Sequence, residues 1–121
     1  MIIQNLNDYI IMEKEIWVPV KFENFCSPYW LPYVGVNYEV SNFGRIRNKK
    51  TGNIIAVSDF GYDHAAGFIS HKQLENGYNQ SLMFRVSHVV YGSFIGKCYG
   101  KKVYHRDGHT WNNELSNLYM K

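Results

Sequence analysis

Long apolar runs, paired cysteines and proline are scarce in this chain of 121 residues. No apolar stretch reaches the roughly 20 residues that a membrane-spanning helix needs. No basic region precedes the apolar residues of "MIIQNLNDYIIMEKE", as it would in a signal peptide. We therefore expect a cytoplasmic protein with no membrane partner. Cys26 and Cys98 have no C-x-x-C spacing, so we expect reduced thiols rather than a disulfide or a zinc site.

Lys- and Glu-rich runs that favour helices are also rare, whereas aromatic residues make up 17% of the chain. This composition favours a fold rich in strands and turns. The length and the apolar share of 45% are enough for one core. We therefore expect a single domain over residues 1–121.

Acidic residues are scarce in the middle of the chain. Residues 1–40 hold two Lys and Arg against five Asp and Glu, a net charge of −3, while residues 41–110 hold ten against four, a net charge of +6. A basic region in a balanced chain is typical of proteins that bind nucleic acid, because phosphate neutralisation supplies much of the affinity. A merely solvated cationic surface explains the same charge, and composition alone does not separate the two.

Two segments with aromatic residues precede the basic region. Residues up to Ile16 suggest a short helix or an ordered arm. The segment 17–36, "WVPVKFENFCSPYWLPYVGV", contains six aromatics and all three prolines. Proline favours extended backbone, so we expect a loop or an edge strand held by buried rings. Exposed rings there would instead form a surface for a partner.

The segment 37–57, "NYEVSNFGRIRNKKTGNIIAV", alternates apolar and polar residues around two turns, which predicts a small antiparallel meander that ends in the run 54–57. Its basic residues are candidates for phosphate contacts, and the period-two rule puts the two arginines on one face. These residues are Arg45, Arg47, Lys49 and Lys50.

A strand and a helix are expected further along. "YNQSLMFRV" has the pattern of a strand, and "VSHVVYGSF" (residues 86–94) has apolar residues at 86, 89, 90 and 94, which suit one face of a short helix. His64, His71 and His88 have no partners at ligand spacing, so we expect surface or packing histidines.

Two blocks of the sequence resemble a known family. "EIWVPV" and "YEVSNFGRIRN" resemble the NUMOD4 motif, with an aromatic insert, "KFENFCSPYWLPY", between them. "VYHRDGHTWNNELSNL" is similar to the HNH core of phage homing endonucleases, and the predicted helix looks like the one that precedes that core, with Ser87-His88 where the family has His-Arg. The NUMOD4-like part covers about 15–57 and the HNH-like part about 84–121.

The resemblance implies a role for each HNH residue. His105 stands where the family places its general base, a task suited to a side chain that titrates near neutral pH. Asp107 and Gly108 would form the tight loop that follows. Asn112, Asn113 and Asn117 would hold that loop by hydrogen bonds to the backbone. DNA would contact the basic residues, with Lys101, Lys102 and Arg106 added to those of the meander.

The sequence departs from the family at its metal site. Tyr104 stands where a metal ligand is common, and a neutral phenol is a poor ligand for a hard cation. The helix that would complete the ββα-metal motif is not in this sequence, so we expect an α+β fold with an incomplete motif at its C-terminal end. Asp107 and His109 are candidate replacement ligands for Mg²⁺ or Mn²⁺; otherwise we expect no cofactor.

Three hypotheses follow from these observations. The first is a degenerate HNH protein of phage type that binds DNA and has lost catalysis, in a bacterial host cell. The second is an active HNH nicking endonuclease that depends on Mg²⁺ or Mn²⁺ and uses His105 as its base. The third is an accessory protein that inhibits a host or defence protein through the aromatic insert, with Tyr29, Trp30 and Tyr33 as its surface. The oligomeric state is left open.

Overall fold

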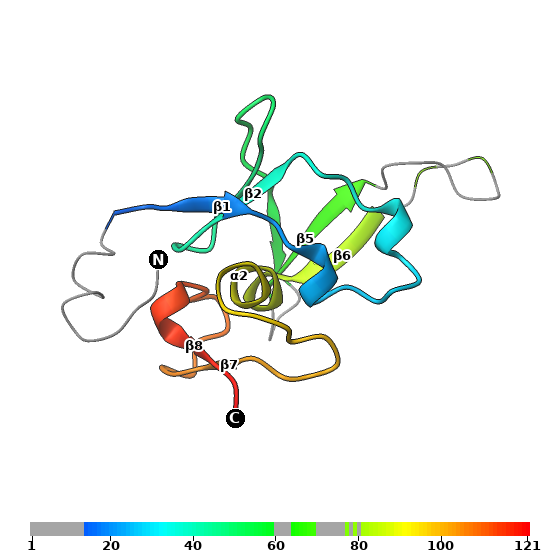
Figure 1. Ribbon diagram of the computed structural model, residues 1–121. Coiled ribbons are helices and arrows are strands. Elements are labelled where there is room, and N and C mark those ends of the chain that lie inside the picture. The colour runs from blue at the N-terminus through cyan, green and yellow to red at the C-terminus, as the bar shows by residue number, and fades with distance from the viewer. Residues whose placement is uncertain (1–13, 60–63, 70–76, 78, 80) are drawn as a thin grey trace.

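The computed structural model describes residues 14–59, 64–69, 77, 79 and 81–121. These residues form three small antiparallel sheets and one α-helix, α2 (Val86–Phe94), which lies between the larger sheets and a C-terminal ribbon (Figure 1). The predicted α+β class and the helix over 86–94 are confirmed. Within the described part of the chain, no helix combines the length and the apolar character that a membrane crossing requires. Residues 1–13 and His71 lie outside the described residues.

The first sheet carries the NUMOD4-like sequence in three strands, β1 (Trp17–Pro19), β2 (Tyr38–Ser41) and β3 (Ile46–Asn48), in the order β1-β2-β3. Val18 pairs with Val40, and Val40 pairs with Ile46, so these three side chains share one face. Val40 and Ile46 are fully buried. The period-two alternation of the sequence thus places one face of this sheet against the core.

The second sheet has the order β4-β5-β6, with strands β4 (Val57–Asp59), β5 (His64–Ile69) and β6 (Ser81–Arg85). It corrects the prediction that residues 54–57 form a third strand of the meander. Ile54 makes a single bridge to Arg47, and Val57 begins β4 in the other sheet. Ile54 and Val57 are exposed while Ile55 packs on the core, so no continuous apolar face holds the run on the first sheet.

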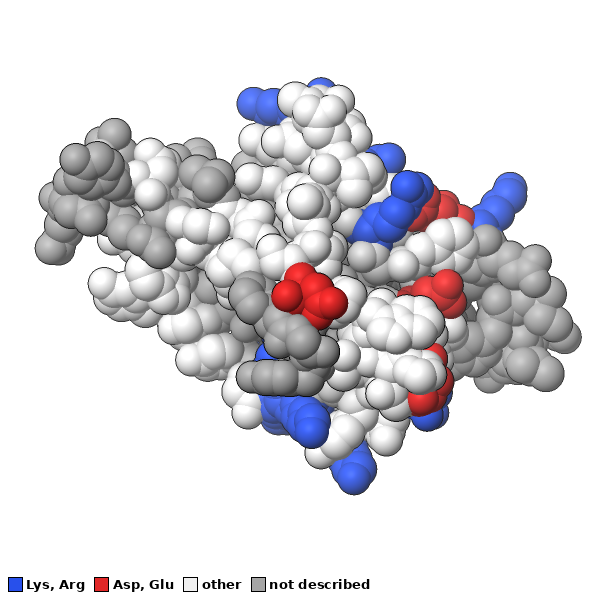
Figure 2. All heavy atoms as spheres, turned by 180° about the vertical axis from the view of Figure 1, so that it is seen from behind, with Lys and Arg blue, Asp and Glu red and all other residues white. Residues whose placement is uncertain are grey.

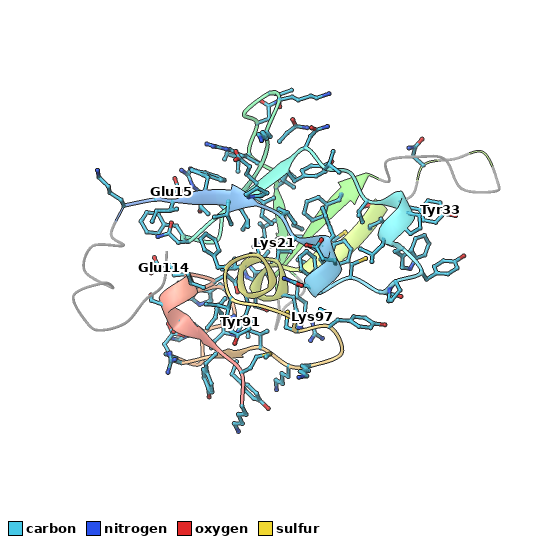
Figure 3. The ribbon with its side chains drawn as sticks, viewed as in Figure 1. Glu15, Lys21, Tyr33, Tyr91, Lys97 and Glu114 are labelled. Atoms are coloured by element: carbon cyan, nitrogen blue, oxygen red, sulfur yellow. The ribbon has the colours of Figure 1, made fainter. Side chains whose placement is uncertain are left out.

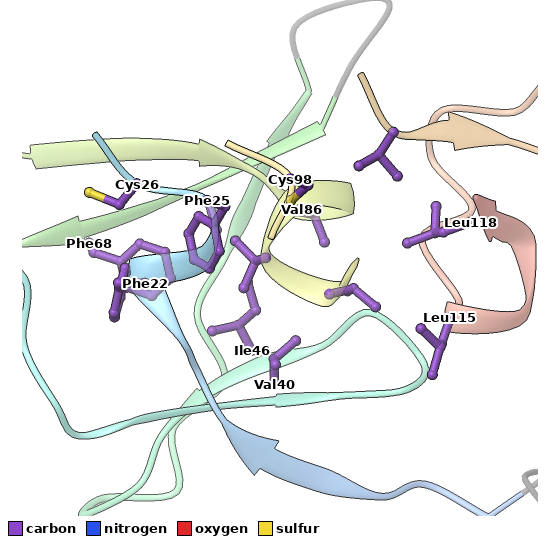
Figure 4. Packing of buried hydrophobic residues seen from close by; sticks show 14 residues of the cluster. Phe22, Phe25, Cys26, Val40, Ile46, Phe68, Val86, Cys98, Leu115 and Leu118 are labelled. Atoms are coloured by element: carbon purple, nitrogen blue, oxygen red, sulfur yellow. The ribbon is translucent and has the colours of Figure 1, made fainter. Parts of the chain in front are cut away.

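The core surrounds helix α2: it fills the space between this helix and the two larger sheets and continues to Leu115 and Leu118 of the C-terminal part (Figure 4). Val86, Val89 and Val90 are essentially inaccessible to solvent, and each fully buried valine contributes about 1.5–3 kcal/mol. Helix α2 also approaches the short 3-10 helix η1 (Phe22–Asn24) closely. A Cβ added to Gly92 would lie 2.8 Å from a ring carbon of Phe25, so only glycine permits this contact.

The aromatic segment anchors this core. Phe22 and Phe25 are buried. The Phe22 ring meets those of Phe68 and Phe84 at centroid distances of 5.2 and 5.7 Å, and the Phe25 ring meets that of Phe84 at 5.2 Å. The segment continues through a second 3-10 helix, η2 (Leu31–Tyr33).

The C-terminal part contains β7 (Tyr104–His105), the 3-10 helix η3 (Leu115–Asn117) and β8 (Leu118–Tyr119). Strands β7 and β8 pair antiparallel, Tyr104 with Tyr119 and His105 with Leu118. The HNH-like loop therefore lies between β7 and η3.

Candidate nucleic-acid interface

Asp107 organises the HNH-like loop by accepting hydrogen bonds on both carboxylate oxygens. Its Oδ1 accepts from the His109 backbone N–H at 2.8 Å and from Asn117 Nδ2 at 2.9 Å, and its Oδ2 accepts from Asn112 Nδ2 at 2.8 Å. Donors from Asn112, His109 and Asn117 hold the pKa of the Asp107 carboxyl below its usual value, at about 2. The carboxylate is therefore ionised and already occupied by donors of its own loop.

Asn117 ties the loop to the ribbon. Its Oδ1 accepts from the Asp107 backbone N–H at 3.1 Å, and its Nδ2 also donates to the Asn112 carbonyl at 2.8 Å. The Arg106 N–H donates to the Asn117 carbonyl at 2.8 Å. Asn117 is buried, so these bonds satisfy groups that water does not reach.

Asn113 fixes the tautomer of His105. The Nδ2 of Asn113 donates to the Thr110 carbonyl at 3.3 Å, which leaves Oδ1 to face His105 Nε2 at 2.8 Å. An amide oxygen can only accept, so Nε2 of His105 carries the hydrogen. In a neutral imidazole the acceptor is then Nδ1, the atom that could take a proton from water.

The loop is also attached to the turn between β2 and β3. The Leu115 N–H donates to the Asn42 carbonyl at 2.8 Å, and the buried Asn42 side chain bonds the backbone of Lys14 and Ile16. Gly44 has a φ of +86°, and a Cβ there would lie 3.0 Å from the Asn113 carbonyl oxygen. The two family-like blocks of the sequence therefore meet at Asn42 and Gly44.

A cleft of about 370 Å³ lies beside His105. It is lined by residues of β6, α2, β7 and the loop, namely Arg85, Ser87, His88, Lys102, Val103, His105 and Thr110. His88 Nε2 donates to the Lys101 carbonyl at 2.8 Å, whereas its Nδ1 is buried with no hydrogen-bond partner among the described residues. The two cationic side chains, Arg85 and Lys102, and the hydroxyl of Thr110 suit a phosphate group.

The outer face of the β7–β8 ribbon combines tyrosines with cations. Tyr104 and Tyr119 stack at a centroid distance of 5.4 Å. The Nζ atoms of Lys102 and Lys121 lie 5.0 and 4.7 Å from the centre of the Tyr104 ring, and the Arg106 guanidinium carbon lies 5.0 Å from that of Tyr119. No carboxylate among the described residues forms an ion pair with Lys102, Arg106 or Lys121. Side chains of this ribbon extend away from helix α2 (Figure 3).

The arginines of the first sheet have acidic partners instead. Arg45 forms a two-pronged ion pair with Glu15, and Arg47 Nη2 lies 2.9 Å from Glu39. Both guanidinium groups also lie near the Trp17 ring, at 5.6 and 3.9 Å from its centre. The bond from Arg45 lowers the pKa of the Glu15 carboxyl, so this carboxylate stays charged. Arg45 and Arg47 do share one face, but their charge is largely compensated there.

Lys49 and Lys50 are exposed in the turn that follows β3. The Lys50 N–H donates to Asn48 Oδ1 at 2.9 Å, which shapes the turn. On the face shown in Figure 2, Lys and Arg side chains gather at the upper and lower edges, with Asp and Glu between them. Lys and Arg side chains therefore do not form one continuous patch on this face.

The candidate metal ligands are placed poorly for a cation. Both carboxylate oxygens of Asp107 already accept hydrogen bonds from the loop. The His109 ring stacks on the exposed Trp111, with the two ring centres 5.1 Å apart. The described residues contain no group of three or more His, Cys, Asp or Glu that could hold a metal ion. This donor set does not fit Mg²⁺ or Mn²⁺, which prefer several oxygen ligands. Metal binding by Asp107 and His109 stays a prediction.

The aromatic insert contains both exposed and half-buried rings. Tyr29 is 70% exposed, whereas Trp30 and Tyr33 are half-buried, and Trp30 packs against the core. Tyr29 and Tyr33 both contact the Trp30 ring, at centroid distances of 4.9 and 5.5 Å. The insert thus anchors itself through Trp30, and a partner surface there stays a prediction.

Several residues of these sites were not predicted. Arg85 lies in the cleft, and Tyr119 and Lys121 complete the ribbon face. The alternation "KVYHR" (residues 102–106) carries a signal for that face, because Lys102, Tyr104 and Arg106 share a side by the period-two rule. Tyr119 and Lys121 could not be assigned to this face, because their position depends on how β7 pairs with β8, and the sequence alone does not determine that register.

Comparisons with known proteins agree with this geometry. A family model described as the NUMOD4 motif matches residues 15–81. No match was found among curated proteins. Among solved structures, the fold is similar to a chain in "DNA binding and cleavage by the HNH homing endonuclease I-HmuI", with 26% sequence identity and a TM-score of 0.59. The similarity covers 88% of this chain and 52% of that one, so this chain spans about half the length of its structural relative.

Proposed function

The chain belongs to the NUMOD4-motif HNH endonuclease family, and we propose that it binds DNA through the β7–β8 ribbon and the adjoining cleft, without cutting it. The observation that carries the proposal is the ribbon face, where Lys102, Arg106 and Lys121 lie together with no acidic partner among the described side chains. The solved relative is titled for DNA binding and cleavage by an HNH homing endonuclease, which supports DNA as the ligand.

The cleft gives this interface a place for one backbone phosphate. Lys102 lies both on the ribbon face and in the cleft lining, so a strand that follows the ribbon would reach His105 and Arg85. Phosphate contacts fix the position of a protein on DNA and supply affinity that falls with salt. Binding DNA also requires the compartment where DNA lies, so the proposal includes a cytoplasmic location in a bacterial cell.

Loss of cleavage rests on the donor chemistry around His105. Phosphodiester hydrolysis by this family's chemistry needs a divalent cation that stabilises the leaving oxygen. Tyr104 offers a neutral phenol beside His105, and its ring is stacked on Tyr119. Asp107 is committed to Asn112, Asn117 and His109. These residues support binding better than hydrolysis.

An active nicking endonuclease is the second candidate, because one observation favours it. Asn113 holds the hydrogen of His105 on Nε2, which leaves Nδ1 as the acceptor that a general base requires. This arrangement would serve a base if a cation were held by other means.

One experiment separates the two candidates. Binding of a labelled duplex is measured for the wild type, for the triple variant Lys102→Gln, Arg106→Gln, Lys121→Gln, and for Lys21→Gln, an exposed lysine at the N-cap of η1 that serves as the charge control. Nicking of supercoiled plasmid is measured in parallel with Mg²⁺ and Mn²⁺ for the wild type and His105→Ala. We expect the triple variant to bind about 10- to 100-fold more weakly at low salt, the control to bind within about twofold, and no nicking.

If the wild type nicks plasmid in a metal-dependent way and His105→Ala does not, the protein is an endonuclease and the proposal of binding without cleavage is wrong. Equal affinities of the triple variant and the wild type would remove the ribbon from the interface.

A further inference from the structure

The β7–β8 ribbon presents a pair of stacked aromatic rings rather than cations alone. Tyr104 and Tyr119 lie directly opposite each other in the register, and their ring planes are 26° apart. Both rings are half-buried, while Lys102, Arg106 and Lys121 around them are exposed. The opposite side of the ribbon faces the protein, because Val103 and Leu118 are buried and His105 bonds Asn113.

Stacked tyrosines flanked by cations match the requirements of an unpaired strand. Bases of a single strand expose their flat faces and stack on aromatic side chains, and the phosphates between them attract Lys and Arg. Bases inside a duplex are covered by their neighbours and cannot reach such rings unless they leave the stack. A face that meets only duplex phosphates can use the hydroxyl groups of tyrosines but has no use for the flat faces of their rings.

The cations now over the rings do not block this use. Lys102 and Lys121 lie over Tyr104 at 5.0 and 4.7 Å, and Arg106 lies over Tyr119 at 5.0 Å. Contacts of this kind are weak at exposed positions, and the long side chains can turn toward a phosphate. The nearest carboxylate in the sequence, Asp107, is directed to Asn112 and Asn117 and not to these cations.

We infer that the outer face of the β7–β8 ribbon binds a single-stranded segment of DNA, with bases stacked on Tyr104 and Tyr119 and phosphates held by Lys102, Arg106 and Lys121. The inference rests on the proposed function, since the same strand would continue toward the cleft that Lys102 also lines. It adds a preference for unpaired DNA, which the proposed function does not contain.

The test uses a single-stranded oligonucleotide with one 2-aminopurine, and the same strand annealed to its complement. Stacking of 2-aminopurine on a tyrosine quenches its fluorescence. We expect quenching when the wild type binds the single strand. We expect Tyr104→Leu, which keeps an apolar side chain without a ring, to bind the single strand about 5- to 100-fold more weakly relative to the duplex.

Tyr104→Phe is the matched control, because it keeps the ring and loses only the hydroxyl. It should retain the quenching and bind the single strand within about twofold of the wild type. Tyr119→Leu provides an independent second variant if Tyr104→Leu unfolds, and the circular dichroism spectrum of each variant reports folding.

The outcomes separate this inference from the proposed function. Duplex binding by the wild type with no quenching of the single strand overturns the inference alone. Equal losses for single strand and duplex in the leucine variants also overturn it. Failure of the wild type to bind either form would overturn the proposed function together with the inference.

Discussion

The first sheet and the β7–β8 ribbon both place cations over aromatic rings, yet they differ in what else those cations meet. On the sheet, Arg45 and Arg47 lie near Trp17 and are paired with Glu15 and Glu39. On the ribbon, the described part of the structure gives Lys102, Arg106 and Lys121 rings but no carboxylate.

This difference separates cations that are compensated within the fold from cations that have no acidic partner among the described residues. A compensated arginine has to lose its carboxylate before it can hold a phosphate, and its release costs part of the affinity gained. A cation that is held only by a ring costs little to redirect. Judged by the charges in the sequence alone, the two regions are equally good candidates for binding DNA. The interaction partners of those charges in the structure distinguish them.

The largest effect on stability is expected at Gly44, where the turn of the first sheet contacts the loop that leads to the ribbon. Gly44→Ala places a side chain at a φ of +86° and 3.0 Å from the Asn113 carbonyl oxygen. We expect a loss of about 2–4 kcal/mol in the free energy of unfolding, measured with urea. Gly52→Ala is the control, since its φ is +74° and no atom lies within 4 Å of the added Cβ. It should cost about 1–2 kcal/mol from strain alone. Equal losses in the two variants would show that the regions are not in close contact.

A smaller effect is expected where the loop holds His105. Asn113→Ala removes the acceptor of His105 Nε2 and the donor to the Thr110 carbonyl. Because Asn113 is buried, we expect a loss of about 1–3 kcal/mol in stability. Nitrogen NMR of the imidazole should show the Nε2–H tautomer in the wild type. A wild-type His105 protonated at Nδ1 when neutral would contradict this geometry.

The next variant tests the compensated side of the comparison. The double change Arg45→Gln, Arg47→Gln removes two ion pairs at positions that are partly exposed. We expect only a small loss in stability, because exposed ion pairs contribute little, and duplex affinity within about twofold of the wild type. A tenfold loss of affinity in a folded variant would mean that these arginines contact DNA despite their partners.

The smallest effect is expected at Asp107, which is exposed. Its pKa is lowered to about 2, so its bonds stabilise the folded state fully above the unfolded pKa of about 3.9 and are lost as pH falls toward 2. Asp107→Asn replaces one accepting oxygen by a donor that faces other donors. The variant should be less stable than the wild type at pH 6, and the difference in stability should shrink as the pH falls from about 4 to about 2, because the wild-type carboxylate is protonated there. If the difference in stability between the variant and the wild type did not change with pH, the loss would come from packing and not from the charge of Asp107.

Local pattern in the sequence was enough for some of this structure. The spacing of Val86, Val89 and Val90 predicts helix α2, and "SLMFR" within the expected strand became β6. The prediction failed for residues 54–57, because their apolar character does not say which sheet will cover them.

Partners that are distant in the sequence were the part that could not be predicted. Glu15 lies 30 residues before Arg45, and the carboxylate that neutralises an arginine leaves no local pattern. The Asn42 side chain binds the backbone of Lys14 and Ile16, and the Asn42 carbonyl accepts from the Leu115 N–H. The partner groups are backbone atoms, which leave no pattern in the sequence. Tyr119 and Lys121 join the ribbon face only through strand register.

The central claim is that the ribbon, and not the first sheet, meets DNA. The most direct measurement is the dependence of duplex affinity on salt concentration for three proteins: the wild type, the Arg45→Gln, Arg47→Gln variant, and the Lys102→Gln, Arg106→Gln, Lys121→Gln variant. Each phosphate contact contributes about 0.9 to the slope of log affinity against log salt. The account predicts that the ribbon variant lowers this slope by about 2–3 while the sheet variant leaves it within about 0.5 of the wild type. A slope lowered by the sheet variant and unchanged in the ribbon variant would contradict the account.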